Sequence, residues 1–258
     1  MCIRKTICFE IIESDLHHTI KITQKTFNKT FPSVTDRIIE IIHRFPDTHH
    51  LIAIAGPPGC GKSTIALTLA KLLKQANISA VVLSMDGFHR KNSELMANKI
   101  QIGKGQLTLY EIKGAKETYN TNYLFECLEK LNSGEEFYWP IYSRSLHEPV
   151  ENGILINGKA DLYIIEGNYL FLNTEPWNKL SGYFSLKIFI RPKKRFLRKR
   201  LISRKIKGGF SPGDAKSHFK FSDRRNIFEV LIDSTGFDFL LTQKGRYNYK
   251  FHKNPKKR

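Results

Sequence analysis

One short run of residues near position 60 combines glycines, a lysine and hydroxyl side chains at a spacing that suits phosphate binding. Gly56 and the triplet Gly61-Lys62-Ser63 satisfy the pattern G-x-x-x-x-G-K-[ST]. The glycines allow backbone N–H groups to turn inward around a phosphate, the lysine reaches the β- and γ-phosphates, and the serine hydroxyl binds Mg²⁺. We therefore expect a nucleoside triphosphate site at Gly56, Pro57, Pro58, Gly59, Cys60, Gly61, Lys62, Ser63 and Thr64.

The segments on either side of this run are the ones that such a site requires. Residues 51–55 are apolar and of strand length, and residues 62–75 carry apolar side chains at helical spacing. A strand that leads through the loop into a helix places the helix N-terminus, with its partial positive charge, against the phosphates. The alternative is a glycine-rich turn between a strand and a helix that binds no ligand.

Two acidic residues follow apolar segments further along the chain. Asp86 comes directly after the apolar residues 78–85, and Glu166 after residues 162–165. The carboxyl ends of strands in an open parallel sheet face the ligand crevice. One acid can then orient Mg²⁺ while the other accepts a proton from an alcohol. The alternative is that either acid is a solvated turn residue or a helix cap.

The elements that would position these side chains predict an α/β fold, in which a parallel sheet is covered by helices on both faces. The length suits one domain with additions. We expect an N-terminal extension (1–33) without a firm structural assignment, a domain (34–243) and a basic tail (244–258). Asn157-Gly158 suggests a turn at the edge of a small hairpin. The expected strands are 51–55, 78–85, 162–165, 186–190 and 237–241, and the expected helices are 33–45, 62–75, 119–131 and a basic helix within 191–209.

The charge of the chain is strongly positive. Lys and Arg number 42 against 24 Asp and Glu, which gives a net charge of +18. This balance attracts polyanions such as nucleotides, nucleic acid or an anionic membrane face. Residues 191–209 also carry leucine and isoleucine at helical spacing, which predicts a basic amphipathic helix. Residues 244–258 have little apolar content and predict a solvated, mobile tail.

Cysteine placement and hydropathy predict a cytoplasmic protein. Cys2, Cys8, Cys60 and Cys127 form no C-x-x-C pair, which favours reduced thiols over a disulfide framework or a zinc site. No apolar run approaches the ~20 residues that span a bilayer, and charged residues interrupt the first segment where a signal peptide would have its apolar core.

Five segments follow one another behind the phosphate loop: SMDGFHRKN (84–92), GAKETYN (114–120), WPIYSRSLHEPV (139–150), LYIIEGNYLF (162–171) and RLISR (200–204). In this order they resemble the P-loop small-molecule kinases that include uridine kinase, phosphoribulokinase and pantothenate kinase. The likeness is greatest to the bacterial branch labelled nucleoside/nucleotide kinase or fructose-transport-system kinase. It covers residues 34–242, and the ordered combination is more specific than any one motif.

The resemblance implies roles for residues on the acceptor side of the site. Asp86 matches the acid that deprotonates or orients the acceptor hydroxyl, and Glu166 matches the acid near Mg²⁺. Tyr142 and Arg144 match a segment that lines the acceptor pocket, where the arginine would anchor an anionic or polyhydroxyl substrate. His89 would also face the acceptor. The alternatives are that Arg144 is a surface arginine and that His89 is a structural hydrogen-bond partner.

The resemblance also implies a lid over about residues 193–215. Arg200 and Arg204 match the lid arginines, and their spacing of four places them on one face of the basic helix. They would stabilise charge on the transferring phosphoryl group, with a hinge at Gly208-Gly209. The alternative is a solvated basic face. Asp223 and Asn226 fit a D-x-x-N pattern that the family has near the nucleotide.

The chain is thus expected to be an ATP- and Mg²⁺-dependent kinase that transfers the γ-phosphate to a hydroxyl of a nucleoside, sugar, glycerate or pantothenate-like metabolite. Region 90–113 is lysine-rich where members of the family vary, so the family's acceptor pocket cannot be assigned to residues of this chain. The sequence also leaves the oligomeric state open. Two alternatives are a nucleic-acid-linked ATPase and a non-catalytic, ATP-dependent switch or scaffold held to a partner or an anionic surface by its tail. The expected catalytic residues are Asp86, Lys62, Arg200 and Arg204, the substrate-binding residues are Asp86, His89, Tyr142 and Arg144, and the metal ligands are Ser63 and Glu166.

Overall fold

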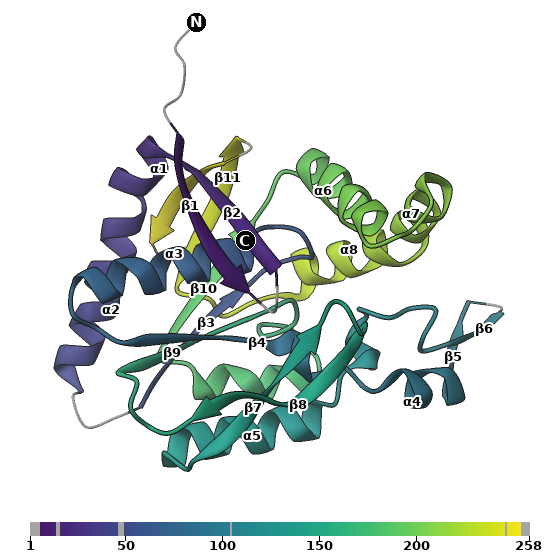
Figure 1. Cartoon of the computed structure of the whole chain (residues 1–258), viewed down its shortest axis with the longest axis horizontal. Helices are drawn as coiled ribbons and strands as arrows, with labels where there is room; N and C mark the ends of the chain where they lie inside the picture. Colours follow the sequence, from purple (N-terminus) through teal and green to yellow (C-terminus); the bar gives the residue numbers. More distant parts are fainter. Residues whose placement is uncertain (1–5, 14–15, 46–48, 104, 246, 254–258) are drawn as a thin grey trace, which may run out of the picture.

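A six-stranded sheet forms the centre of the computed structural model, which describes residues 6–13, 16–45, 49–103, 105–245 and 247–253 (Figure 1). Its strand order is β12–β11–β10–β3–β9–β4. The strands are β3 (His50–Ala55), β4 (Ala80–Ser84), β9 (Leu162–Gly167), β10 (Leu186–Arg191), β11 (Phe239–Gly245) and β12 (Asn248–Lys253). All neighbours are parallel except β11 and β12. The predicted α/β fold with a parallel sheet is confirmed.

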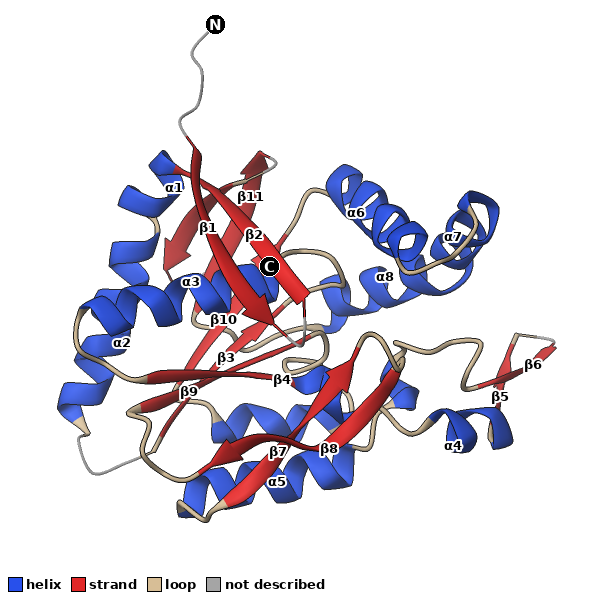
Figure 2. Ribbon diagram, viewed as in Figure 1, coloured by secondary structure: helices blue, strands red, loops and turns tan. Residues whose placement is uncertain are grey.

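Helices cover both faces of this sheet (Figure 2). On β3, Ile52 and Ile54 belong to one apolar cluster, and Leu51 belongs to the cluster on the opposite face. Because successive strand residues point to opposite faces, an entirely apolar strand is buried on both. The first face packs against α2 (Phe31–Arg44) and α3 (Lys62–Gln75), and the second against α5 (Thr121–Ser133) and the 3₁₀-helix η3 (Trp177–Tyr183).

The remaining elements surround the sheet at its two ends. Near the chain ends lie the hairpin of β1 (Thr6–Glu13) and β2 (Leu16–Thr23), followed by α1 (Gln24–Lys29). An arm carries α4 (Asn92–Ala97) and the hairpin of β5 (Lys99–Ile102) with β6 (Gly105–Thr108) (Figure 1). The hairpin of β7 (Phe137–Ser143) with β8 (Glu148–Ile156) lies beside α5 and packs on the core through the buried Trp139. Helices α6 (Lys194–Lys207), α7 (Pro212–His218) and α8 (Arg224–Asp233) form a separate group (Figure 1). Short 3₁₀ segments are η1 (Met85–Phe88) and η2 (Lys116–Thr118), and η4 (Phe219–Asp223) is a π-helix.

Most predicted elements occur within a few residues of their expected bounds, but the turn at Asn157-Gly158 was misplaced. These residues follow β8, whereas the turn of the β7–β8 hairpin lies between Ser143 and Glu148. Asn157 does form a local turn, because its side chain accepts a hydrogen bond from the Lys159 amide over 3.3 Å. The motif therefore marks the approach to β9 rather than the hairpin.

The prediction of a solvated tail over 244–258 was wrong for the part that the structure describes. Residues 244–245 end β11, and β12 pairs antiparallel with β11 at the sheet edge. Tyr249 is buried, and the ring of Phe251 packs on Phe239 with centroids 4.6 Å apart. Aromatic residues alternate with polar ones in this segment, which is the pattern of a half-buried strand, and its many lysines obscured that pattern. Residues 254–258 lie outside the described residues.

The N-terminal segment also belongs to the main body of the protein. Ile22 and Phe31 are both fully buried in the same apolar cluster as β3 and α3. Helix α2 begins at Phe31, so the expected boundary after residue 33 falls inside a helix. Among the described helices, none is long and apolar enough to cross a membrane. Cys8, Cys60 and Cys127 are free thiols.

Candidate active site

The phosphate-binding loop connects β3 to α3 through a backbone that only glycine adopts easily. Gly59 and Gly61 have φ values of 73° and 99°, in the left-handed region. A side chain at Gly61 would also place its Cβ 2.9 Å from the hydroxyl oxygen of Tyr249. The amide of Cys60 donates to the carbonyl oxygen of Pro57 over 3.1 Å and closes the turn. The loop thus delivers the N-terminus of α3 to an open cavity.

Lys62, the first residue of α3, is held in that cavity by a neighbouring amide. Only 9% of its surface is exposed, and its Nζ donates to Oδ1 of Asn168 over 2.7 Å. Asn168 follows β9, two residues after Glu166. The sequence prediction missed Asn168, although its position at the end of a buried strand, beside the expected acid, was a usable signal.

Glu166 connects the phosphate loop to the end of β4. Its Oε1 accepts one hydrogen bond from the Ser63 hydroxyl over 3.1 Å and another from the Ser84 hydroxyl over 3.0 Å. The Ser84 hydroxyl in turn accepts from the amide of Asp86 over 3.2 Å. Glu166 is thus bonded directly to the loop, and Asp86 is linked to Glu166 through Ser84. The sequence prediction also missed Ser84.

Asp86 lies in η1, directly after β4, and its carboxylate accepts a hydrogen bond from Tyr119. The Tyr119 hydroxyl lies 3.2 Å from Asp86 Oδ1, and burial raises the pKa of this phenol well above its ordinary value, so it stays a donor. Burial by itself raises the pKa of Asp86, but nearby positive charges outweigh it, and the pKa lies below its ordinary value of 3.8. In decreasing order of effect, these charges belong to His89, whose imidazole is positive only when it is protonated at low pH, and to the cations Lys62, Arg204 and Arg144.

His89 is a neutral partner of the same turn at ordinary pH. Burial lowers its pKa below the ordinary value of 6.5, against the opposing influence of Asp86. Its Nδ1 lies 2.8 Å from the Asp86 carbonyl oxygen, which can only accept, so Nδ1 carries the proton. The imidazole packs on Tyr119 and Tyr142, with ring centroids 4.0 and 5.2 Å away. His89 therefore supports the turn that carries Asp86.

Helix α6, which the sequence analysis expects to form a lid, contributes two arginines to the cavity. Arg200 donates from Nη1 to the carbonyl oxygen of Gly59 over 3.0 Å, so it binds the phosphate loop directly. Arg204, one turn further along α6, also lines the cavity. Leu197 and Leu201 on the same helix are buried and anchor it to the domain.

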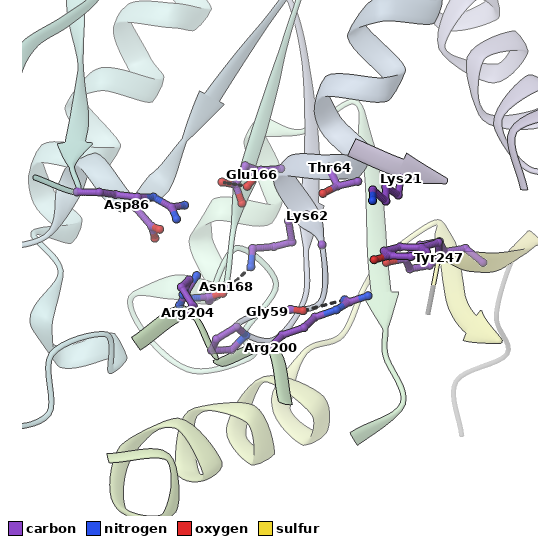
Figure 3. A pocket seen from close by; sticks show the side chains of 15 residues that line it. Lys21, Gly59, Lys62, Thr64, Asp86, Glu166, Asn168, Arg200, Arg204 and Tyr247 are labelled. Carbon is purple, nitrogen blue, oxygen red and sulfur yellow. Dashed lines mark hydrogen bonds between the residues drawn. The ribbon is translucent and has the colours of Figure 1, made fainter. Parts of the chain in front are cut away.

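A single cavity of about 270 Å³ brings these groups together. Figure 3 shows Asp86 and Tyr247 on opposite sides of Lys62. Five cationic side chains and two carboxylates line the cavity, so its charge suits a polyphosphate. The lining residues are Lys21, Pro58, Gly59, Gly61, Lys62, Ser63, Thr64, Asp86, Arg144, Glu166, Asn168, Arg200, Arg204, Tyr247 and Tyr249.

Several residues singled out from the sequence do not line this cavity, and among them are Gly56, Pro57 and Cys60 of the phosphate loop. His89 and Tyr142 stack beside Asp86 behind its wall. Asp223 and Asn226, expected near the nucleotide, do not line the cavity that holds the phosphate loop. Asn226 instead lines a separate cavity of about 50 Å³ against residues 112–115. Conversely, Lys21, Tyr247 and Tyr249 line the main cavity, and no motif in the sequence pointed to them.

A comparison with protein families decides the class of this site. The model of the "Phosphoribulokinase / Uridine kinase family" matches residues 51–221, which is well over half of the chain. The chain belongs to this family. The protein is accordingly a small-molecule kinase, a phosphotransferase that acts on a hydroxyl group, and kinases of this family use ATP.

Individual relatives agree with this assignment. The "Uncharacterized protein YggC" of Escherichia coli is 35% identical over 208 residues, which cover 79% of this chain and 83% of that protein. A pantothenate kinase of Streptococcus pyogenes is 31% identical over 144 residues, 54% of this chain and 44% of its own length. The crystal structure of a "putative fructose transport system kinase" from Silicibacter superposes with a TM-score of 0.73 at 26% identity, over 83% of this chain and 98% of that one.

Proposed function

We propose that this kinase transfers the γ-phosphate of ATP directly to the hydroxyl of a small metabolite, a nucleoside, sugar, glycerate or pantothenate-like compound, which Asp86 orients. The observation that supports this most is that the Asp86 carboxylate and the phosphate loop line one cavity of about 270 Å³. A donor and an acceptor held in one cavity react without the entropy cost of a bimolecular encounter.

The nucleotide end of the cavity is preorganised for phosphate. The first N–H groups of α3 lack partners within the helix and point toward the loop opening, where they attract anions. Lys62 adds a positive charge whose position is fixed by Asn168 over 2.7 Å. Since the ammonium is already held in the cavity, little side-chain entropy is lost when the β- and γ-phosphates bind.

The oxygen atoms around Glu166 fit Mg²⁺. This ion prefers oxygen ligands, and with nucleotides it is held by one or two protein oxygens together with phosphates and water. Ser63 and Glu166 offer such oxygens 3.1 Å apart. In the part of the chain that the structure describes, no cluster of three or more His, Cys, Asp or Glu side chains could hold a metal by itself. Ser63 and Glu166 would hold the ion, which supplies positive charge against the phosphate oxygens.

Asp86 orients the acceptor and receives its proton. Because its pKa is lowered, the carboxylate is ionised at neutral pH and accepts a hydrogen bond from the attacking hydroxyl. As the acceptor oxygen forms its bond to the γ-phosphorus, the bond from that phosphorus to the ADP oxygen breaks, and the hydroxyl proton passes to Asp86. A carboxylate of low basicity suits a loose transition state, in which the hydroxyl loses its proton late.

Two arginines near Asp86 supply positive charge to the cavity. Arg204 lines the cavity from the lid helix, and Arg144 lines it from the turn after β7. Arg204 is placed to neutralise the negative charge that spreads over the γ-oxygens in the transition state. The second, near Asp86, is placed to bind a carboxylate, a phosphate or neighbouring hydroxyls of the acceptor.

The decisive experiment is a screen for an acceptor. Purified protein with ATP and Mg²⁺ is offered nucleosides, pantothenate, glycerate, ribulose 5-phosphate and simple sugars, and phosphorylated products are detected by mass spectrometry. We expect at least one small alcohol to be phosphorylated, and Asp86→Asn to abolish that product. If RNA or DNA instead stimulated ATP turnover many-fold while no small alcohol did, the proposal would be wrong.

A further inference from the structure

The wall of the cavity opposite Asp86 is built by the two ends of the chain. Lys21 comes from β2, Tyr249 from β12, and Tyr247 from the residues just before β12. All three line the same cavity as the phosphate loop, yet all lie outside residues 51–221, the part matched by the family model. This wall accordingly belongs to this chain's own terminal segments rather than to the shared core.

The phosphate loop defines which part of a nucleotide faces this wall. Lys62 and Ser63 act on the β- and γ-phosphates. The backbone of the next residue, Thr64, lies further from the transferred phosphoryl group. Lys21 and Tyr247 lie beside Thr64, away from Asp86 (Figure 3). Given the proposed function, on which this inference rests, the α-phosphate and the nucleoside of bound ATP therefore face Lys21 and Tyr247.

The chemistry of these two side chains matches that end of the nucleotide. An ammonium is a compact positive charge that suits a phosphate. A tyrosine ring offers an apolar face on which a nucleobase stacks. The side chain of Tyr247 is half-buried, and Lys21 is exposed to solvent at the cavity mouth.

Hydrogen bonds hold the two chain ends together, so that the wall is formed before a ligand arrives. The amide of Thr23 donates to the carbonyl oxygen of Tyr247 over 3.0 Å. The Thr26 hydroxyl donates to the Asn248 side chain and accepts from the Tyr249 amide, each over 3.0 Å. Together these bonds fix Tyr247, whose own carbonyl group is bonded, relative to Lys21, which lies two residues before Thr23.

We infer that Lys21 and Tyr247 form a nucleoside-side subsite of the ATP site, in which Lys21 binds the α-phosphate and Tyr247 packs against the base. The subsite prefers a nucleotide over an inorganic polyphosphate, because Tyr247 has no partner surface on a bare phosphate chain. The N-terminal hairpin thereby becomes part of the ATP site instead of an appendage.

Calorimetric titration of the full-length protein with ATP, ADP and inorganic tripolyphosphate tests this inference. Tyr247→Ala should weaken ATP and ADP binding by about tenfold, which is about 1.4 kcal/mol, and should leave tripolyphosphate binding nearly as it was. Tyr247→Phe keeps the ring and should recover most of the affinity. Lys21→Met should weaken all three ligands, and the KM for ATP should rise by more than kcat falls.

Matched controls separate these effects from general ones. Lys25→Met removes an exposed lysine of α1, four residues further along the chain, and Tyr138→Ala removes an exposed tyrosine on β7; both variants should bind ATP as the wild type does. If Lys21→Met and Tyr247→Ala also bind ATP like the wild type, the inference is overturned, while acceptor phosphorylation by the wild type still supports the proposed function. If Tyr247→Ala weakens tripolyphosphate as much as ATP, the base contact is likewise refuted.

Discussion

The hydroxyl of Tyr249 donates a hydrogen bond to the carbonyl oxygen of Cys60 over 3.1 Å, which joins the last strand of the sheet to the phosphate loop. Arg200 binds the neighbouring carbonyl of Gly59. Two successive carbonyl groups of the loop are therefore satisfied by side chains from distant elements. This arrangement constrains the loop while its N–H groups remain available to an anion.

Removing this hydroxyl should destabilise both the fold and the nucleotide site. Tyr249→Phe leaves the buried Cys60 carbonyl without this donor, which costs about 1 kcal/mol of the free energy of unfolding. Urea denaturation measures this loss, and calorimetry should show ATP binding weakened several-fold. The control Tyr138→Phe alters an exposed residue and should change neither quantity. Equal stability of the two variants would contradict a role for the Tyr249 contact.

The two arginines of α6 that line the cavity should differ in what they contribute to the reaction. Arg204→Ala should lower kcat by about a hundredfold or more and leave the Kd for ATP within about twofold, because this side chain acts on charge that develops in the transition state. Arg200→Ala should weaken ATP binding as well, since it releases the Gly59 carbonyl. Steady-state kinetics with calorimetry separates the two effects. The control is Arg198→Ala, which alters an exposed residue of α6. If Arg204→Ala is as active as the wild type, the role assigned to Arg204 is refuted.

The Glu166 carboxylate should set the requirement for Mg²⁺. Glu166→Gln keeps an oxygen that accepts from Ser63 and Ser84 but removes the negative charge. Because charged oxygen ligands bind the ion more strongly, the Mg²⁺ concentration for half-maximal activity should rise by about tenfold or more. A Mg²⁺ titration at fixed ATP measures it, with Glu126→Gln on α5 as the exposed control. An unchanged requirement would remove Glu166 from the metal site.

Protonation of His89 should lower stability in a defined pH window. The folded protein holds the pKa of His89 below its ordinary value of 6.5, so the unfolded chain binds more protons between that lowered pKa and 6.5. The free energy of unfolding therefore decreases as pH falls through this window. Asp86, whose pKa is also lowered, adds a second decrease only below about its ordinary 3.8. Urea denaturation between pH 7 and pH 5 should show a smaller decrease for His89→Gln than for the wild type; parallel curves would argue against a buried neutral imidazole.

Local signals in the sequence were sufficient for the centre of the site. The apolar run before Gly56 and the helical spacing after Lys62 define a strand, a loop and a helix without reference to the rest of the chain. Asp86 and Glu166 could be paired because parallel strands end at the same edge of a sheet, and β4 and β9 are indeed neighbours.

Contacts between distant segments were beyond such signals. The Tyr249–Cys60 bond joins residues 189 positions apart, and no periodicity in either segment points to the other. The lysines around Tyr249 and Phe251 gave β12 the composition of a solvated tail, while burial of the two aromatic side chains determined its structure. The contact between the rings of Tyr142 and His89 could not be predicted either, because the orientation of a hairpin side chain depends on packing that the motif does not encode.

The central claim is that Asp86 acts on the acceptor hydroxyl while the phosphate loop holds the nucleotide. Calorimetry of ATP binding and acceptor phosphorylation, measured together on Asp86→Asn and Lys62→Ala, test it most directly. The account predicts that both variants lose phosphate transfer, that Lys62→Ala loses most of its affinity for ATP, and that Asp86→Asn retains it. Equal loss of ATP binding in both variants, or transfer by Asp86→Asn at the wild-type rate, would contradict it.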